Sequence, residues 1–314
     1  MLPIIDVSSW LVVKDETSGA NEKSWLRDPG LPNLPANRWV FKPVTVHDDG
    51  SVQGGDWAER LACEVASRLG VSSAEIEMAV RGGTFGTLSR NVRPNDEWEI
   101  WEGALWLDAD PSAEYSLAGG RTSRRVRGAS AGHSLPELRR ALQLIGPPPG
   151  MTSSAEDGWD AFAWMMTLDA LVANRDRHEH NWSVLRPSLG SGQPRLASAY
   201  DNEGAFGFNL TDDFRARLLG DRAALDRRIG RGTAWRYWWT GDKVPTLVEA
   251  ARIACEGASE STRIGVVQAL SEFDIGSVNM QVVPRMSDVA RNFSRTLLST
   301  NLERLQNELR DIVS

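Results

Sequence analysis

The pattern of apolar and polar positions divides the chain into a strand-rich first part and a mainly helical second part. Short apolar runs bounded by turn residues predict strands over 4–13, 38–43, 75–80, 86–92 and 97–107. Apolar residues at three- and four-residue steps predict helices over 135–145, 159–172, 212–219, 222–229, 246–255 and 261–273, and a long last helix capped by Ser287. We therefore expect an α+β fold with two lobes, divided as residues 1–110 and 111–314.

An amphipathic helix interrupts the strand-rich part. Gly54-Gly55-Asp56 introduces it, with Asp56 as the expected N-cap, and Gly70 stops it. Its apolar residues form one stripe, which consists of Trp57, Leu61, Val65 and Leu69. Glu59 and Glu64 lie off this stripe. Most helical glutamates are solvated, so neither residue indicates a function by itself.

Length, composition and charge exclude several classes of protein. The chain has 314 residues, of which 41% are hydrophobic, and it can bury a sizeable core. Its net charge of −7 disfavours direct DNA binding, because neutralising phosphates requires a concentrated basic surface. Cys63 and Cys255 lie in apolar helical contexts that favour reduced, packed thiols. Neither a signal-peptide pattern nor an apolar run near the ~20 residues of a spanning helix is found, so we expect a cytoplasmic protein without membrane contact.

The polar stretch 173–183 is the strongest candidate for chemistry. It follows the predicted helix 159–172, which should end at Asn174, and it leads into a strand-like run at 182–185. Loops that join a helix to a strand often carry functional side chains on a rigid scaffold. Asp176 and Asn181 are five residues apart, which is the offset of the Asp and Asn in a kinase catalytic loop.

Two further stretches fit such a loop. Lys42 emerges from the apolar strand 38–43, and the glutamate-bearing helix follows it. This is the order in which a kinase small lobe builds the ion pair that fixes its phosphate-binding lysine. Further along, a hairpin of 182–185 and 195–200 should bring Asp201 beside Asn181. An amide and a carboxylate at the ends of adjacent strands suit a hard cation such as Mg²⁺.

Residues 109–134 differ in character from the rest of the chain. They contain almost no apolar residues and carry Arg121, Arg124, Arg125 and Arg127. This composition predicts a mobile surface loop. The alternative is a surface that docks an anionic substrate or a tRNA-like partner.

Taken together, these residues resemble the kinase-like domain of HipA-type serine/threonine protein kinases. The matching stretches are Ser18-Gly19-Ala20-Asn21-Glu22-Lys23, Phe41-Lys42-Pro43, Glu59, Asn174 to Asn181, and Tyr200-Asp201-Asn202. The family shares an Asp-Arg-His-x-x-Asn loop with phosphatidylinositol kinases, which is matched by Asp176, Arg177, His178 and Asn181. The resemblance does not extend to the extra N-terminal subdomain of the longer HipA toxins, so the partner contacts made there are not carried over.

The resemblance implies an activity and a set of partners. ATP and Mg²⁺ would be the cofactors, and a protein serine or threonine hydroxyl would accept the phosphoryl group. The chain would act as a protein kinase, with the toxin of a toxin–antitoxin system as one setting and an antitoxin as a candidate partner. A bilobal protein-kinase-like fold is implied, with a β-rich N-terminal lobe and a mainly helical C-terminal lobe.

The resemblance also implies roles for individual residues. Asp176 would orient the attacking hydroxyl, while Asn181 and Asp201 would hold Mg²⁺. Lys42 would contact the α- and β-phosphates, oriented by Glu59 or, as second choice, by Glu64. His178 would support the loop or the phosphates. The nucleotide phosphates would be covered by the small-residue loop of Ser18, Gly19, Ala20, Asn21 and Lys23.

Three alternatives stay open at this point. His178, His180, Asp176 and Asp201 could form the zinc site of a metal-dependent hydrolase, since His-x-His spacing can ligate zinc. A pseudokinase would bind nucleotide without catalysis, although the presence of Lys42 and Asp176 counts against it. A lipid or small-molecule kinase shares the loop motif and is not separated from a protein kinase by it.

One prediction concerns regulation. In some members of the family, phosphorylation of a serine in the glycine-rich loop shuts the site, and Ser18 is the matching residue here. We expect mass spectrometry to find a phosphate on Ser18 after the protein has been incubated with ATP. An unmodified Ser18 under these conditions would contradict the hypothesis.

Overall fold

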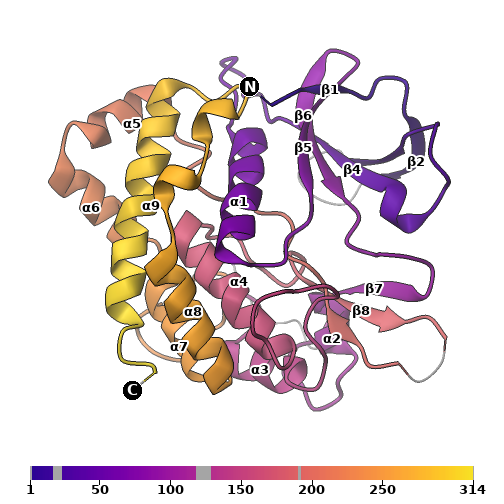
Figure 1. Ribbon diagram of the computed structural model, residues 1–314, viewed down its shortest axis with the longest axis vertical. Helices are drawn as coiled ribbons and strands as arrows, with labels where there is room; N and C mark the ends of the chain where they lie inside the picture. The colour runs from indigo at the N-terminus through magenta and orange to yellow at the C-terminus, as the bar shows by residue number, and fades with distance from the viewer. Residues whose placement is uncertain (1, 17–22, 118–128, 190–191, 314) are drawn as a thin grey trace.

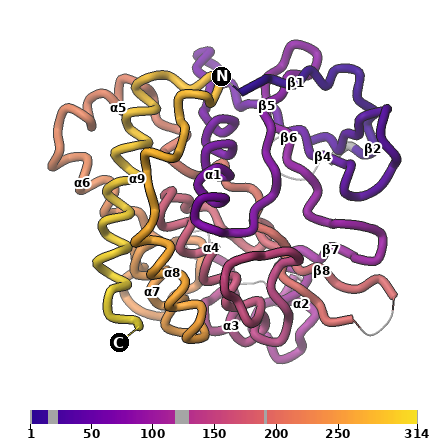
Figure 2. Tube along the Cα trace, viewed as in Figure 1, coloured from indigo at the N-terminus to yellow at the C-terminus, as the bar shows by residue number. Residues whose placement is uncertain are grey.

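The structure is a computed structural model that describes residues 2–16, 23–117, 129–189 and 192–313. Strands gather on one side of the molecule and helices on the other, with helix α1 (Gly55–Leu69) between them (Figure 1). The chain passes from the strand-rich part, in indigo and purple, to the helical part, in pink to yellow (Figure 2). The predicted α+β class is confirmed.

The larger sheet has six strands in the order β1-β5-β6-β4-β3-β2. Their bounds are β1 Ile5–Asp6, β2 Leu11–Glu16, β3 Lys23–Arg27, β4 Arg38–Pro43, β5 Ile76–Arg81 and β6 Thr84–Arg90. β1 runs parallel to β5, and the other neighbouring pairs are antiparallel. Leu26, Phe41 and Leu88 point from this sheet into a small apolar cluster of its own. The register places Lys42 of β4 opposite Thr87 of β6, near the middle of the sheet.

A second, smaller sheet corrects one expectation. It consists of β7 (Trp98–Glu102), β8 (Ser183–Pro187) and β9 (Arg195–Leu196). The run 97–107 was expected to be one strand that completes the first sheet. Instead, β7 pairs with β8, and helix α2 (Gly103–Asp108) begins immediately after it. The reason lies in tertiary contact, since Gly103 N donates to the carbonyl oxygen of Trp182 and packs so closely on its indole that a methyl group would overlap the ring.

The remaining helices lie close to their predicted ranges. They are α3 Leu135–Leu142, α4 Gly158–Val172, α5 Asp212–Leu219, α6 Arg222–Gly230, α7 Leu247–Glu256, α8 Glu260–Glu272 and α9 Asp288–Glu308, with short 3₁₀ turns at Pro35–Asn37, Ile275–Ser277 and Met280–Val282. Ser287 caps α9 as expected, because its hydroxyl accepts a hydrogen bond from Ala290 N. Among the described helices, none combines the length and the apolar character needed to cross a membrane.

The start of α1 corrects a second expectation. Gly54, and not Asp56, is the N-cap of this helix. Asp56 is buried within the first turn, where its carboxylate accepts hydrogen bonds from Trp57 N and from Arg285 Nε at 2.8 Å each. Its side chain therefore ties α1 to the segment before α9. The predicted apolar stripe and the stop at Gly70, which has a left-handed conformation with φ 85°, are confirmed.

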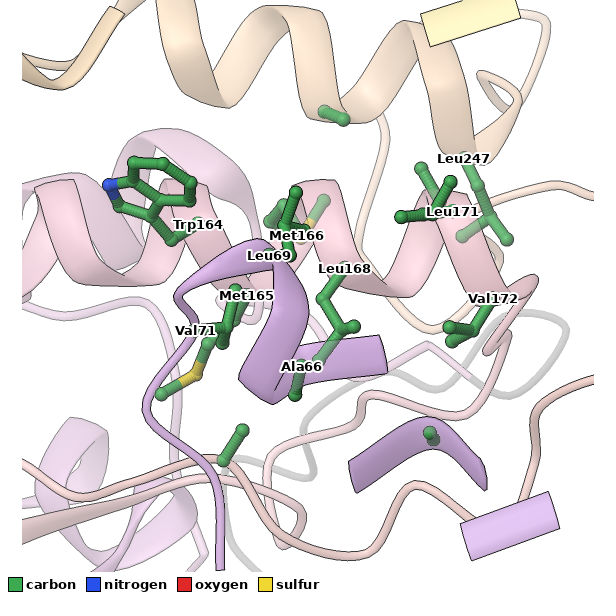
Figure 3. Packing of buried hydrophobic residues seen from close by; sticks show 14 of the residues in the cluster. Ala66, Leu69, Val71, Trp164, Met165, Met166, Leu168, Leu171, Val172 and Leu247 are labelled. Carbon is green, nitrogen blue, oxygen red and sulfur yellow. The ribbon is translucent and has the colours of Figure 1, made fainter. Parts of the chain in front are cut away.

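Helix α4 is the central element of the core. The sequence predicted one apolar face, but every residue from Gly158 to Val172 is buried. Packing against α1 on one side and α7 on the other explains the difference (Figure 3). Figure 3 shows Ala66 and Leu69 of α1 on one side of α4 and Leu247 of α7 on the other. The helix ends with Ala173 in the left-handed conformation, one residue before the predicted Asn174.

The segment before α3 corrects a further expectation. Residues 109–134 were predicted to be a surface loop, yet residues 129–133 are buried. Gly132, at φ 82°, packs so closely on the backbone of Tyr115 that a methyl group there would overlap it. Small residues allow this close approach. The low hydrophobicity of residues 129–133 therefore reflects tight packing of small side chains and not exposure to solvent. Arg121, Arg124, Arg125 and Arg127 lie outside the described residues.

One hydrophobic core runs through both parts of the molecule. It joins Leu61 and Val65 of α1 to Leu168 and Leu171 of α4. The division of the chain into residues 1–110 and 111–314 stays a prediction.

The close contact between β4 and β6 generates a test of stability. A methyl group on Gly86 would overlap the carbonyl oxygen of Lys42, which belongs to rigid backbone. Gly86→Ala should therefore lower the free energy of unfolding by about 2 kcal/mol or more. Urea unfolding measures it, with Gly230→Ala as the matched control, because a methyl group there meets no atom within 4 Å. Equal effects of the two substitutions would contradict this account.

Candidate functional site

Arg177 fixes the position of the candidate loop, residues 174–181. Its guanidinium is fully buried and forms a two-pronged ion pair with Asp169 of α4, at 2.8 and 3.0 Å. Its Nη1 donates to the carbonyl oxygens of Asn181 and Tyr200, each at 2.8 Å, and its Nη2 donates to Asn202 Oδ1 at 2.5 Å. One side chain thereby joins the end of α4, the loop 174–181 and the segment after β9. The loop and the Asp201 region are brought side by side, as the predicted hairpin required.

Local hydrogen bonds fix Asp176 and Asn181 within the loop. The Asp176 backbone N donates to Asn174 Oδ1 at 3.1 Å, and Asn174 Nδ2 donates to Asp169 at 2.9 Å. The side-chain amide of Asn181 donates to the Asp176 carbonyl oxygen at 2.8 Å. The Asn181 Oδ1 atom is not used in this bond and stays available as an oxygen ligand. The Asp176 carboxylate is 40% exposed, so an acceptor hydroxyl can reach it.

Lys42 lies among three carboxylates from different segments. Its Nζ is 2.7 Å from Asp201 Oδ1, 3.6 Å from Glu59 Oε2 and 4.0 Å from Glu203 Oε2. Burial would lower the pKa of Lys42, but Asp201 and Glu59 raise it overall, so the ammonium stays charged. Lys23, at the start of β3, adds a second positive charge 3.7 Å from Asp201 Oδ2. The predicted residues Lys23, Lys42, Glu59 and Asp201 therefore meet at one place.

The two candidate glutamates of α1 have different surroundings. Glu59 is fully buried, faces Lys42 and accepts a hydrogen bond from Thr87 Oγ1 at 3.4 Å. Burial raises the pKa of Glu59, and Lys42 only partly offsets that effect. Glu64 pairs instead with Arg60 and Arg68 of its own helix. The geometry favours Glu59 over Glu64 as the partner of Lys42.

Asp201 and Glu203 respond differently to the same lysine. Burial would raise the pKa of Asp201, but Lys42 and Lys23 lower it overall, so this carboxylate is ionised. Burial raises the pKa of Glu203 to about 7, since Lys42 is farther away and Asp201 and Glu59 repel its charge. Asp201 also has a left-handed backbone, with φ 57°, which an aspartate tolerates. Three carboxyl groups thus share two lysines, and Asp201 is the one that these lysines hold firmly ionised.

This donor set fits a divalent cation of the Mg²⁺ type. An ionised carboxylate on Asp201 and the amide oxygen of Asn181 are hard oxygen donors, and they come from segments that Arg177 holds together. A cation here would favour the ionised forms of Glu59 and Glu203, whose pKa values burial raises. Asn181 and Asp201 are therefore the residues that could hold the metal.

Arg236 contacts Asp176 directly, although no sequence motif pointed to it. Arg236 Nε donates to Asp176 Oδ1 at 2.6 Å, and Nη2 contacts the same oxygen. Its guanidinium also stacks 4.0 Å above the ring of Trp235. Arg236 and Asp176 are 60 positions apart in the sequence, so no local pattern could reveal their contact.

The two loop histidines point to different carboxylates. His178 Nε2 is 4.0 Å from Asp176 Oδ2, and His180 Nδ1 is 2.7 Å from Glu102 Oε2. Burial lowers the pKa of His178, with Asp176 opposing. Within the residues that the structure describes, no group of three or more His, Cys, Asp or Glu side chains is arranged to bind a metal. The histidines thus do not converge as a zinc hydrolase would require.

His133, which no sequence motif indicated either, binds the backbone of Arg236. Its ring is buried and stacks on Tyr237 at 5.0 Å. Trp182 Nε1 is only a donor, so His133 Nε2 accepts its hydrogen bond at 3.1 Å, and Nδ1 carries the proton donated to the Arg236 carbonyl oxygen at 3.1 Å. The neutral ring is thereby fixed in one tautomer, and it connects the residue after Asn181 to the residue that contacts Asp176.

Part of the predicted site is not described. Ser18, Gly19, Ala20 and Asn21 lie outside the described residues, between the paired strands β2 and β3. The predicted roles of these four residues, and of Asp176, Asn181, His178, Lys42 and Asp201, stay predictions.

Comparisons with known proteins support the fold. No protein-family model and no curated protein matches the sequence. The crystal structure of the proinflammatory kinase CtkA of Helicobacter pylori matches with a TM-score of 0.73 at 17% identity, covering 98% of this chain and 99% of that chain. A chain of the Shewanella oneidensis MR-1 toxin–antitoxin complex of HipA, HipB and operator DNA gives a TM-score of only 0.47 at 13% identity, over 95% of this chain and 66% of that one. The first match confirms the predicted kinase-like fold.

The buried imidazole generates a prediction about pH. Burial lowers the pKa of His133 from 6.5 to about 4. Because the folded-state pKa lies below the unfolded value, neutral His133 stabilises the protein above pH 6.5, and this contribution is lost as the pH falls toward 4. We expect His133 to account for a loss of about 2 kcal/mol between pH 7 and pH 5.

Urea unfolding at a series of pH values measures this loss. His133→Gln is the control, since an amide can donate and accept hydrogen bonds but does not titrate. The variant should be less stable at pH 7 and should show a flatter pH profile than the natural chain. Parallel profiles would show that the buried ring does not govern this transition.

Proposed function

We propose that this chain is an ATP- and Mg²⁺-dependent phosphotransferase, namely a HipA-like serine/threonine protein kinase. The observation that carries the proposal is the meeting of Lys42, Glu59 and Asp201 at 2.7 to 3.6 Å, although they come from three distant segments. A lysine fixed by a helix glutamate beside a metal-binding aspartate is the arrangement that kinases use for nucleotide phosphates. The kinase-like fold and the match of Asp176 and Asn181 to the family's loop support the same reading.

Lys42 is the residue for the nucleotide phosphates in this proposal. Its ammonium is buried yet stays charged, because Asp201 and Glu59 stabilise the charge. A permanent positive charge at a fixed position binds phosphate oxygens without loss of side-chain freedom. Glu59 acts on the nucleotide only through Lys42, so it is a positioning residue.

Asp176 is the residue for the acceptor hydroxyl. Its backbone is fixed by Asn174 and its carboxylate is exposed, so it can accept a hydrogen bond from an incoming serine or threonine. The ion pair with Arg236 keeps this carboxylate in place. In phosphoryl transfer, positioning matters more than a strongly basic catalyst, since the transition state is loose.

Asn181 and Asp201 are the proposed Mg²⁺ ligands. The metal, when bound, would neutralise charge that develops on the transferred phosphoryl group. Asp201 is suited to bind the metal because Lys42 and Lys23 keep its carboxylate ionised. Asn181 serves because its amide nitrogen is held by the Asp176 carbonyl, which orients its oxygen. His178, 4.0 Å from Asp176, would support the loop.

The biological setting belongs to the proposal as well. A protein serine or threonine hydroxyl is the proposed acceptor, and an antitoxin is the proposed partner if the chain is a toxin. A cytoplasmic location fits the need for ATP. The net charge of −7 disfavours direct DNA binding by this chain.

Loss of the Asp176 carboxylate tests the activity. Asp176→Asn should reduce transfer of labelled phosphate from ATP by about 100-fold or more, because the hydroxyl loses its acceptor. Acceptors in the assay are the chain itself and a mixture of serine and threonine peptides. A thermal shift with ATP and Mg²⁺ should be unchanged, since Asp176 does not touch Lys42 in the cluster described above.

The matched control is Glu64→Gln, which alters a glutamate that faces Arg60 and Arg68. It should retain transfer. Full transfer by Asp176→Asn would contradict the proposed role. Nucleotide binding by the natural chain without any transfer would instead indicate a pseudokinase.

A further inference from the structure

A cavity of about 660 Å³ opens directly beside Asp176. Its wall is built from the catalytic loop, the segment after Asp201, helices α5 and α6, the segment 231–236 and helix α9. Gly204 contributes a close approach, because a methyl group there would meet Asn174 Oδ1 at 2.8 Å and Asp176 Cβ at 3.1 Å. A side chain at Gly204 would therefore press on the loop that carries Asp176.

The charge of this wall is opposite to that of the whole chain. Five arginines line it, namely Arg175, Arg227, Arg228, Arg231 and Arg236, against the two carboxylates of Asp176 and Glu203. The chain as a whole carries a net charge of −7. Arg175, Arg227, Arg228 and Arg231 are exposed, so an anionic ligand in the cavity can reach their charge.

Most of these arginines lack an anionic partner. Arg236 pairs with Asp176, but Arg175, Arg227, Arg228 and Arg231 have no ion pair to a carboxylate in the described part of the chain. Burial and the neighbouring Arg228 both lower the pKa of Arg175, which places two guanidinium groups near one another. The C-terminus of α6 offsets part of the charge on Arg227 and Arg228 through its helix dipole. Arg231 is the C-cap residue of the same helix, and Arg175 belongs to the catalytic loop.

The floor of the cavity is apolar. Its side chains come from α5, α6 and α9, and they include Phe214, Leu218, Ile229, Phe293 and Leu297. The guanidinium of Arg228 lies 5.3 Å above the Phe214 ring, so charge and apolar surface adjoin. A flexible protein segment offers apolar and acidic side chains in alternation, which matches this wall. A nucleic-acid backbone offers the negative charge but no aliphatic side chains for the floor.

We propose that this cavity binds the segment of the acceptor protein next to the phosphorylated hydroxyl, and that it selects acidic side chains together with an apolar one. The acidic side chains face Arg228 and Arg231, and the apolar side chain packs on Phe214 and Leu218. This inference rests on the proposed kinase function, since it assigns the substrate class of the same site. Electrostatic complementarity of this kind contributes chiefly to specificity and association rate.

Peptide binding tests the inference without requiring catalysis. The probes are two fluorescent peptides of equal length, each with a serine and two leucines, flanked by glutamates in one and by lysines in the other. Fluorescence anisotropy is measured with the full chain, Mg²⁺ and a non-hydrolysable ATP analogue. The acidic peptide should bind about tenfold or more tightly than the basic peptide.

Charge reversal at the cavity locates the site. The double variant Arg228→Glu with Arg231→Glu should lose the preference for the acidic peptide, with at least about a tenfold weaker affinity. The matched control is Arg295→Glu with Arg310→Glu, which changes the same net charge at two exposed arginines that do not line the cavity. The thermal shift with ATP and Mg²⁺ should be the same for both variants, which shows that the fold and the nucleotide site persist.

The outcomes separate the two proposals. Equal binding of the two peptides, or an equal effect of the two double variants, would overturn the substrate assignment. Tighter, cavity-dependent binding of a single-stranded RNA oligonucleotide or of vesicles containing a phosphoinositide would also overturn it and identify the alternative occupant. Selective peptide binding without any phosphoryl transfer from ATP would show that the cavity binds acidic peptides, but it would reject the kinase function and with it the role of the cavity as a substrate site.

Discussion

The buried guanidinium of Arg177 is the constraint on which the site depends. Removing an arginine from water costs several kcal/mol unless its charge and its donors are satisfied. Asp169 supplies the charge, and the carbonyl oxygens of Asn181 and Tyr200 together with Asn202 Oδ1 take the remaining donors. Satisfying one side chain thus forces three segments into one arrangement. Asp169 belongs to α4, which is buried on all sides. The ion pair therefore fixes the three segments against the central helix of the core.

From this anchor the site extends in two directions that differ in electrostatics. Toward the larger sheet, Lys42 lies among the carboxyl groups of Glu59, Asp201 and Glu203. Toward α6, arginines line a cavity with little compensating negative charge. Asp176 lies between these two regions and contacts Arg236. A cation with a nucleotide suits the first region, and an anionic acceptor suits the second. In the proposed reaction, the phosphoryl group would pass from the first region to the second.

Much of the fold was predictable because it depends on neighbours in the sequence. Periodicity and caps located α1, α4 and α9, including the stop at Gly70 and the cap at Ser287. Three of the errors share a cause. β7 left the expected sheet, α2 replaced the end of a strand, and residues 129–133 proved buried, because Gly103 and Gly132 permit close backbone approach. Judged from its neighbours in the sequence, a glycine is predicted to lie in a loop. Only its contact with a residue far away in the sequence shows that it is tightly packed.

The sequence by itself determined the types of side chain and their order: a strand lysine, a helix glutamate, the pair Asp176 and Asn181, and a following aspartate. Spacing within one loop sufficed for Asp176 and Asn181, since five residues cannot lie far apart. The tertiary structure alone decided that Lys42 meets Asp201 across 159 positions, that Glu59 rather than Glu64 faces it, and that Arg236 reaches Asp176. Such contacts are set by packing around α4 and by the neutralisation of buried charge, which no local pattern encodes.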